Sequence, residues 1–365
     1  MRIREATTND KEKWNNFVET EDGTFFHYFE WKTIYEVNQW QYIPLILEND
    51  AQDIMGILPI VKIKLFFYSK LLSLPDGASG GFLFKRTLFE AEKNQGIQLF
   101  LQYIDHHHSK RCSAFYLKEN LQLEDALRSQ PTDMLVKNGF TFRFDEEIKL
   151  PCTYRLPLSA SFENDIWDGL WGKYLRNHIR KSQKQGIIIR EDTTGYYRED
   201  VITMLLSIYK KFDETPPSRE ELISRLTTFK DNTKVWIAFL DDGPIAALVC
   251  YYYRSSVCYA SKMGYHAPAR DNYTTVLLFS EAICDACENG YQFFEFGVTE
   301  TPTLARWKEQ FKPIKIPLRI YVMKYSLIRR FFEKTPSLIR WTVNNIPYIW
   351  HHRKRIFRKI MRGEI

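Results

Sequence analysis

Helix and strand patterns recur in the same order twice along the chain, and this order limits the possible folds more than any other feature. Helical stretches, such as 31–37 in the first half and 165–185 and 274–289 in the second, alternate with apolar strand patterns, and a glycine follows each of the last two. In the second half, the apolar runs 235–239 and 245–253 flank Asp241-Asp242-Gly243, which predicts a hairpin. The sequence therefore predicts an α+β fold with two lobes, 1–155 and 156–323, and a tail, 324–365. Only the order of elements is duplicated, and no residue-level repeat is found.

Composition and charge exclude several classes of protein. The chain has 365 residues, of which 44% are hydrophobic and 15% aromatic, a balance that excludes disorder. No run reaches ~18 apolar residues, and residues 1–5 are charged, so neither a spanning helix nor a secretory signal is expected. The six cysteines are expected to be reduced thiols, because nothing in the sequence suggests export. These features predict a cytoplasmic protein.

No metal site is expected. Cys284 and Cys287 form a single pair inside a predicted helix, and no second pair follows at zinc-ligand spacing. The histidines 106–108 end another predicted helix, where imidazoles interact favourably with the helix dipole. Both groups are better explained by packing and capping than by metal binding.

Four segments together resemble the FemAB-type aminoacyltransferases. They are 25–31, the helix-to-glycine segment 171–186, the segment 281–297 that ends in Phe-Phe-Glu-Phe-Gly, and Leu-Ala-Arg-Trp-Lys-Glu-Gln-Phe-Lys at 304–312. The resemblance implies two tandem acetyltransferase-like (GNAT) lobes with the active site in the second lobe. It also implies transfer of an amino acid or acyl group to an amine, often on a cell-wall or surface-polymer precursor. Glu295, Trp307 and Lys312 depart from the family pattern, and the long helical hairpin with which some members grip tRNA has no candidate here.

The resemblance places the chemistry at Lys308 and Glu295. Attack of an amine on an activated ester or thioester needs positioning, a route for the proton, and positive charge beside the developing oxyanion. Lys308 would supply that charge, and the alternative is a surface lysine on a short basic helix with Arg306. Glu295 ends an apolar strand and would act as general base. The alternative is a strand-end carboxylate that is hydrogen-bonded to the next loop.

Substrate binding is expected from a basic helix and from the start of a later helix. Lys173, Arg176 and Arg180 recur at spacings of three and four, so they share a face suited to phosphates, although such a face is often simply solvated. Arg270, Asp271 and Tyr273 precede the helix where GNAT enzymes bind the CoA pyrophosphate. That stretch lacks glycine, which disfavours ordinary acetyl-CoA. Trp307 completes the expected binding set.

The C-terminal tail is strongly basic. Residues 324–365 hold eleven Lys and Arg against two acids, a net charge of +9, whereas the rest of the chain carries −3. Aromatic residues interleave with the cations, so the tail is expected to bind an anionic membrane surface, with RNA or the protein's own surface as alternatives. The residues expected at the membrane are Trp341, Trp350, Arg353, Lys354, Arg355, Phe357, Arg358 and Lys359.

Together these expectations describe a peripheral membrane acyl- or aminoacyltransferase without a tightly bound cofactor. Its acceptor would be an amine on a lipid- or nucleotide-linked precursor. The donor stays open between aminoacyl-tRNA and an acyl-CoA or acyl carrier. The alternative is a non-catalytic GNAT-like scaffold at the membrane. The sequence leaves the oligomeric state open.

Overall fold

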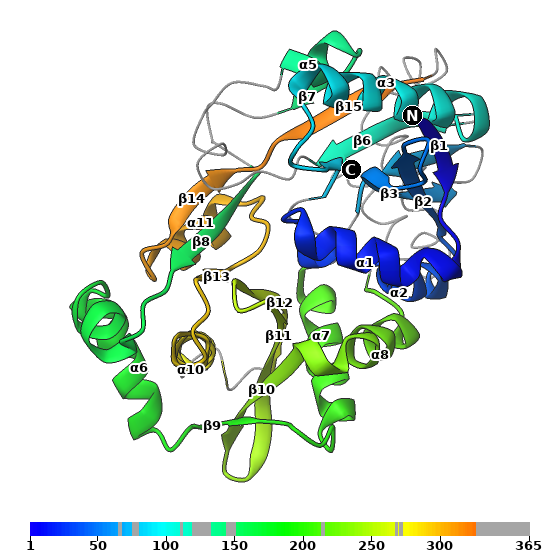
Figure 1. Cartoon of the computed structure of the whole chain (residues 1–365). Coiled ribbons are helices and arrows are strands. Elements are labelled where there is room, and N and C mark those ends of the chain that lie inside the picture. Colours follow the sequence, from blue (N-terminus) through cyan, green and yellow to red (C-terminus); the bar gives the residue numbers. More distant parts are fainter. Residues whose placement is uncertain are drawn as a thin grey trace, which may run out of the picture. The chain divides into compact units, whose positions relative to one another are not determined.

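The computed structural model describes residues 1–64, 68–74, 80–109, 112–118, 133–143, 151–212, 216–266, 269 and 273–325 (Figure 1). The chain divides into two compact units. Among the described residues, the first holds the chain up to residue 118, residues 133–143 and residues 319–325, and the second holds residues 151–318. Each unit is built around its own sheet.

The first unit contains an eight-stranded mixed sheet in the order β1-β2-β3-β4-β6-β15-β7, with β5 paired to β3. Most neighbours are antiparallel, whereas β4 and β6 are parallel. The strands are β1 (Arg2–Glu5), β2 (Gln41–Glu48), β3 (Ile54–Lys64), β4 (Ser69–Leu72), β5 (Leu83–Phe84), β6 (Cys112–Lys118), β7 (Thr141–Arg143) and β15 (Ile320–Lys324).

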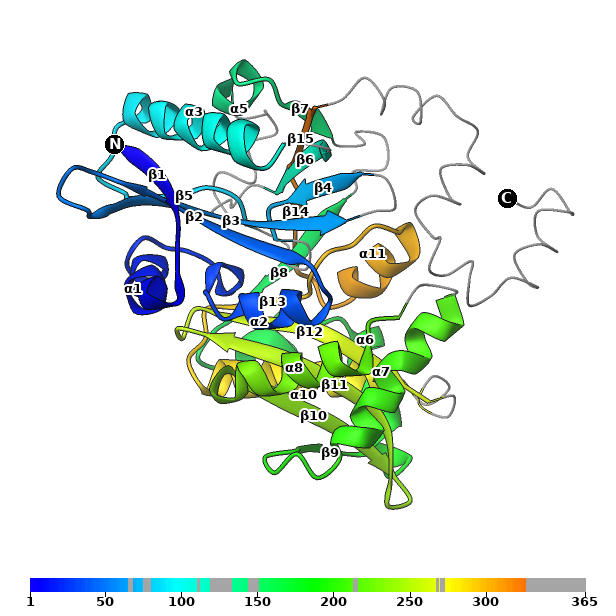
Figure 2. The same cartoon turned by 90° about the vertical axis from the view of Figure 1, so that its right-hand side faces the viewer.

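Helices pack on both faces of this sheet because its strands are apolar on both sides (Figure 2). Leu45 and Leu47 of β2 face a cluster that includes Phe100 of α3 (Glu90–His107). Ile46, between them, faces a cluster with Trp14 of α1 (Lys11–Thr20) on the opposite face. The other helical elements in the described part of this unit are α2 (Trp31–Val37), α5 (Asp133–Lys137) and the 3-10 turns Thr8–Asp10 and Phe25–His27.

The second unit contains a seven-stranded sheet in the order β14-β8-β13-β12-β11-β10-β9. Its neighbours are antiparallel except for β12 and β13, which are parallel. The strands are β8 (Cys152–Pro157), β9 (Ile188–Glu191), β10 (Thr233–Leu240), β11 (Gly243–Tyr253), β12 (Val257–Tyr265), β13 (Phe293–Glu295) and β14 (Ile314–Pro317).

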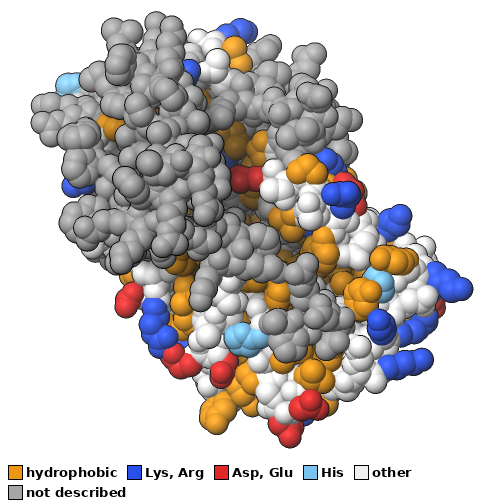
Figure 3. Space-filling model, turned by 180° about the vertical axis from the view of Figure 1, so that it is seen from behind, with side chains coloured by type: hydrophobic (Ala, Val, Ile, Leu, Met, Phe, Trp, Pro, Cys, Tyr) orange, Lys and Arg blue, Asp and Glu red, His pale blue; other side chains and the backbone are white. Residues whose placement is uncertain are grey.

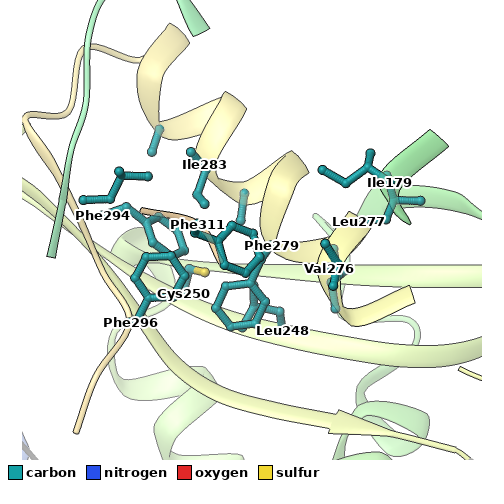
Figure 4. Packing of buried hydrophobic residues seen from close by; sticks show 14 of the residues in the cluster. Ile179, Leu248, Cys250, Val276, Leu277, Phe279, Ile283, Phe294, Phe296 and Phe311 are labelled. Atoms are coloured by element: carbon teal, nitrogen blue, oxygen red, sulfur yellow. The ribbon is translucent and has the colours of Figure 1, made fainter. Parts of the chain in front are cut away.

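One face of the second sheet carries α10 and α6, and the other carries α7 and α8 (Figure 1). The main core lies under α10, where Phe279 meets Phe294, Phe296 and Phe311 and where Leu248 and Cys250 reach up from β11 (Figure 4). The helical elements are a π-helix (Phe162–Asp168), α6 (Lys173–Lys184), α7 (Arg198–Phe212), α8 (Arg219–Thr228), a 3-10 turn (Lys230–Asn232), α10 (Thr274–Glu288) and α11 (Pro302–Glu309).

The α+β class with a sheet in each half is confirmed, and the unit boundaries differ from the predicted ones in two places. Strand β15 completes the sheet of the first unit by pairing with β6 and β7, although the sequence places it in the second lobe. Strand β8 lies wholly in the second sheet, across the predicted border at 155. The single helix predicted over 165–185 is also interrupted at Gly169–Gly172. A strand belongs to the sheet of the strand with which it pairs, and that partner can lie far away in the sequence, so local patterns do not fix these boundaries.

Several predicted residues lie outside the described part of the chain. They are Arg270, Asp271 and the whole tail beyond Tyr325, so their roles stay predictions. Within the described residues, no helix has the length and apolar character needed to cross a membrane, and no group of three or more His, Cys, Asp or Glu side chains is placed to hold a metal ion.

Candidate functional site

The second sheet parts between β12 and β13, and the predicted catalytic residues lie at this point. The two strands pair only over Val257–Tyr259 and Phe293–Glu295, although β12 continues to Tyr265. Residues 257–259 are buried, whereas 260–263 are partly exposed in the middle of the sheet. We call this place the strand divergence.

A β-bulge marks the strand divergence. Val249 of β11 pairs with Lys262 and Cys250 pairs with Ala260, so Ser261 is the extra residue on β12. A bulge bends its strand and redirects the side chains beside it. It therefore changes the direction of the Lys262 side chain at the point where β12 loses β13 as a neighbour.

The loop after β13 runs close to β12. Gly297 has a φ of 75°, and a Cβ on it would lie 3.4 Å from the carbonyl oxygen of Ala260. Glycine fits this left-handed conformation without a steric penalty. Thr299, two residues on, forms an isolated antiparallel bridge to Cys152 of β8. The loop 297–299 is therefore held between β12 and β8.

Glu295 supports this loop from the end of β13. Its carboxylate is 1% exposed and accepts hydrogen bonds from the Thr153 hydroxyl, from Arg155 Nε at 3.0 Å and from the Gly297 amide at 3.3 Å. Thr153 and Arg155 alternate with buried Tyr154 on β8, so both point to the same face of the sheet. Of the two alternatives raised by the sequence, this geometry corresponds to the carboxylate bonded to the next loop.

Lys308 supports the same loop from α11. Its ammonium group donates to the carbonyl oxygens of Gly297 and Val298 at 2.8 and 3.2 Å and to Thr299 Oγ1 at 2.9 Å. The side chain is 4% exposed, so Lys308 is not the surface lysine of the alternative interpretation. Burial lowers its pKa to about 8, against the opposing effect of Glu295. All three N–H donors of the ammonium group are used within the loop.

The start of α10 carries a group of stacked rings. Tyr273, at the N-cap with a φ of 55°, stacks on His178 of α6, with ring centroids 3.9 Å apart and planes at 14°. Tyr174 meets the same imidazole edge to face, and Lys181 Nζ lies 5.1 Å from the Tyr273 ring centroid. Burial, followed by the Lys181 charge, lowers the pKa of His178. The predicted binding residue Tyr273 therefore lies against the predicted basic helix.

The cations of α6 lie on an exposed face of the second unit, where Figure 3 shows Lys and Arg side chains gathered around a histidine. The helix has five Lys and Arg and no acid. Arg176 pairs with Asp168, the Arg180 guanidinium lies 5.3 Å from the Trp167 ring centroid, and Lys173 is exposed. Cation–π stacking leaves the charge of Arg180 in place.

Trp307 lies on α11 with a partly exposed side chain, and its role in substrate binding stays a prediction. Its ring packs edge to face against Phe279 and Phe311, at centroid distances of 4.9 and 5.4 Å. The indole therefore belongs to the edge of the core under α10. Trp307 and Lys308 are neighbours in the sequence. Adjacent residues of a helix point to different sides, so these two side chains of α11 have different surroundings.

Sequence reasoning missed four polar residues of this region. Thr153 and Arg155 hold Glu295, and Lys262 Nζ donates to the Tyr209 hydroxyl at 2.9 Å from the bulged strand to α7. Alternation along 152–156 signals a strand, but nothing local identifies its partner. The bulge at Ser261 likewise has no signature in the sequence.

Comparisons with known proteins agree with this geometry. Residues 173–309 match the family model described as an acetyltransferase (GNAT) domain. No curated protein matches the chain. The fold is similar to that of FemX, with a TM-score of 0.67 and 11% identity, covering 89% of this chain and 98% of FemX.

Two further solved structures are similar in fold over most of the chain. L-PGS from Bacillus licheniformis gives a TM-score of 0.55 at 15% identity, with 90% of this chain and 96% of that one covered. A tandem GNAT protein from the clavulanic acid biosynthesis pathway gives 0.53 at 9% identity, with 88% and 98% covered. Residues 173–309 therefore match a GNAT acetyltransferase domain, and the chain as a whole has a fold similar to those of FemX and of a tandem GNAT protein.

Proposed function

We propose that the chain transfers an acyl or aminoacyl group from an activated ester or thioester to an amine, forming an amide at the strand divergence. The observation that carries this proposal is the parting of β12 from β13 beside a bulge, within a domain that matches the acetyltransferase family. Beyond Tyr259, β12 no longer has β13 beside it, and we infer that its backbone groups at 260–263 bind a carbonyl group and the chain attached to it.

The reaction needs no covalent enzyme intermediate. The amine nitrogen attacks the carbonyl carbon, a C–N bond forms, and the carbonyl oxygen gains negative charge. The C–O or C–S bond then breaks, and the leaving oxygen or sulfur keeps the bonding electrons and takes up the proton that the amine loses. Cys152, which bridges to Thr299 of the loop, is a buried thiol, and burial raises its pKa, so it stays protonated and is a weak nucleophile.

Within this proposal, Lys308 and Glu295 are positioning residues. Both hold the loop 297–299 against β12, one through three donated hydrogen bonds and the other by accepting the Gly297 amide. The loop forms one border of the strand divergence, so a displacement of about 1 Å there would misalign the reacting groups and lower turnover.

The donor and acceptor belong to the classes that the sequence left open. The exposed α6 cations and the rings at Tyr273 are suited to a phosphate-bearing molecule, as in an aminoacyl-tRNA or an acyl-CoA. The name of one protein with a similar fold, a putative lysylphosphatidylglycerol synthetase from Agrobacterium fabrum, favours aminoacyl transfer to a cell-envelope acceptor, as does the resemblance of the sequence to FemAB-type aminoacyltransferases. We propose that the tail holds the protein at an anionic membrane surface beside such a lipid- or nucleotide-linked acceptor.

A labelling experiment tests this function. The purified full chain is incubated with mixed radiolabelled aminoacyl-tRNA or with labelled acetyl-CoA. Acceptors are phosphatidylethanolamine vesicles or a nucleotide-linked peptide with a free lysine amine. We expect label in an alkali-stable amide product, and RNase treatment should abolish the reaction only if RNA carries the donor. Absence of amide product with every pair would refute the proposal and favour the scaffold alternative.

A further inference from the structure

Lys262 is a cation beside the strand divergence with donors to spare, whereas Lys308 has none. Lys308 spends three N–H donors on the loop 297–299. An ammonium group has only three, so binding a developing oxyanion would require Lys308 to release a buried acceptor. A cation other than Lys308 is therefore better able to supply the positive charge that amide formation requires.

Lys262 has the position that this role requires. It follows the bulged residue Ser261 and lies three residues beyond Tyr259, the last β12 residue that pairs with β13. Its side chain is partly exposed although β12 is an inner strand of the sheet. Exposure of an inner strand at this point places the ammonium group where a substrate can approach.

The contacts of Lys262 leave its charge available. Its ammonium group donates to the Tyr209 hydroxyl at 2.9 Å and lies 5.7 Å from the centroid of that ring. Among the described residues, no carboxylate lies within 4.0 Å of it. Within the described part of the chain, this leaves two of the three N–H donors of the ammonium group without a protein acceptor.

Tyr209 is itself held in place. It lies on α7, which packs closely on β12: the Ser207 hydroxyl donates to the Tyr265 carbonyl at 3.0 Å, and a Cβ on Gly264 would lie 2.3 Å from the carbonyl carbon of Met204. The phenol is therefore fixed relative to the bulged strand, and it restricts the long Lys262 side chain to one region. Preorganised charge of this kind is the form that stabilises transition states.

We propose that Lys262, oriented by Tyr209, is the cation that stabilises the carbonyl oxygen during acyl transfer, an inference that rests on the proposed function. As the amine attacks and the C–N bond forms, the oxygen gains negative charge and Lys262 donates to it. When the C–O or C–S bond breaks, the charge leaves with the departing group and Lys262 returns to its starting contacts. The lysine keeps its own proton throughout. Tyr209 is a positioning residue.

Steady-state kinetics of four variants test this inference, with the donor and acceptor pair found active for the unmodified protein. Lys262→Met should lower kcat roughly 10²-fold with little change in the KM for the donor, because the interaction forms only in the transition state. Lys262→Arg should recover part of the loss, and Tyr209→Phe should lower kcat by roughly tenfold without changing the KM. Lys230→Met removes an exposed lysine of the same unit and should leave both constants unchanged.

The outcomes separate the two proposals. A kcat of Lys262→Met within about threefold of the unmodified protein would overturn the role of Lys262 alone, and so would a raised KM with unchanged kcat. A melting temperature equal to that of Lys230→Met shows that the variant is folded. If the unmodified protein transfers no group to any acceptor, the proposed function fails and this inference fails with it.

Discussion

Replacing Glu295 by Gln should destabilise the second unit, because it leaves the Arg155 guanidinium buried without a counter-ion. Arg155 Nε lies 3.0 Å from the Glu295 carboxylate, and the two side chains are 14% and 1% exposed. Glutamine keeps an oxygen for Thr153 or the Gly297 amide, so the change mainly removes the negative charge. The substitution therefore tests the ion pair more than the packing.

The expected loss is about 3 kcal/mol. Breaking a buried pair by removing one partner costs roughly 3–5 kcal/mol, and the partial exposure of Arg155 favours the lower end of that range. For a unit of this size, a loss of about 3 kcal/mol lowers the melting temperature by roughly 6–12 °C. The double variant Arg155→Met/Glu295→Gln removes both charges and should recover at least half of the loss.

Urea and thermal unfolding followed by circular dichroism would measure this loss. Glu300→Gln is the matched control, because Glu300 is an exposed carboxylate five residues further along the same segment and should stay within about 0.5 kcal/mol of the unmodified protein. Equal stability of Glu295→Gln and Glu300→Gln would refute the reasoning. A double variant less stable than Glu295→Gln would refute the assignment of the loss to the unpaired charge.

Two further predictions concern stability. Burial lowers the pKa of His27 in the first unit to about 4 from 6.5, so the unfolded state binds more protons between these values, and the stability should fall by up to about 3 kcal/mol as the pH drops from 6.5 to 4. Urea midpoints at pH 7.5 and 4.5 should differ less in His27→Gln, and equal pH dependence in the two proteins would contradict this. Gly264→Ala should cost about 2 kcal/mol or more, because a Cβ would lie 2.3 Å from the carbonyl carbon of Met204 on α7. Gly243→Ala, with 3.6 Å to its nearest atom, is the control, and equal melting temperatures of the two variants would rule out this close contact.

Local patterns were sufficient for most of the elements. The predicted helix over 31–37 is α2, the Asp241-Asp242-Gly243 signal lies at the turn between β10 and β11, and the helix expected to end before Gly290 is α10. These features depend on side-chain periodicity and turn residues within a few positions of each other. The break at Gly169–Gly172 escaped detection, because apolar residues on both sides continue a helical spacing.

The candidate site was predictable only in part. The resemblance identified Lys308 and Glu295 as candidate site residues. Their roles depend on hydrogen-bond partners elsewhere in the sequence, such as Thr153, which lies 142 residues before Glu295. The sequence assigns Trp307 to substrate binding, and the structure adds that the rings of Phe279 and Phe311 pack against it at the edge of the core. The sequence does not distinguish Lys262, because single lysines are common at exposed positions of strands.

The sequence by itself determined the α+β class, most helices and strands and the second-half segments that carry the resemblance, because these depend on residues close together in the chain. The tertiary structure decided that β15 joins the first sheet, that β12 parts from β13 beside Ser261, and that Lys308 is buried with its donors engaged. The physical reason is that strand pairing and the burial of charge join residues far apart along the chain. The energies of strand pairing and of charge burial depend on which groups come into contact in space, and a local sequence pattern does not specify these contacts.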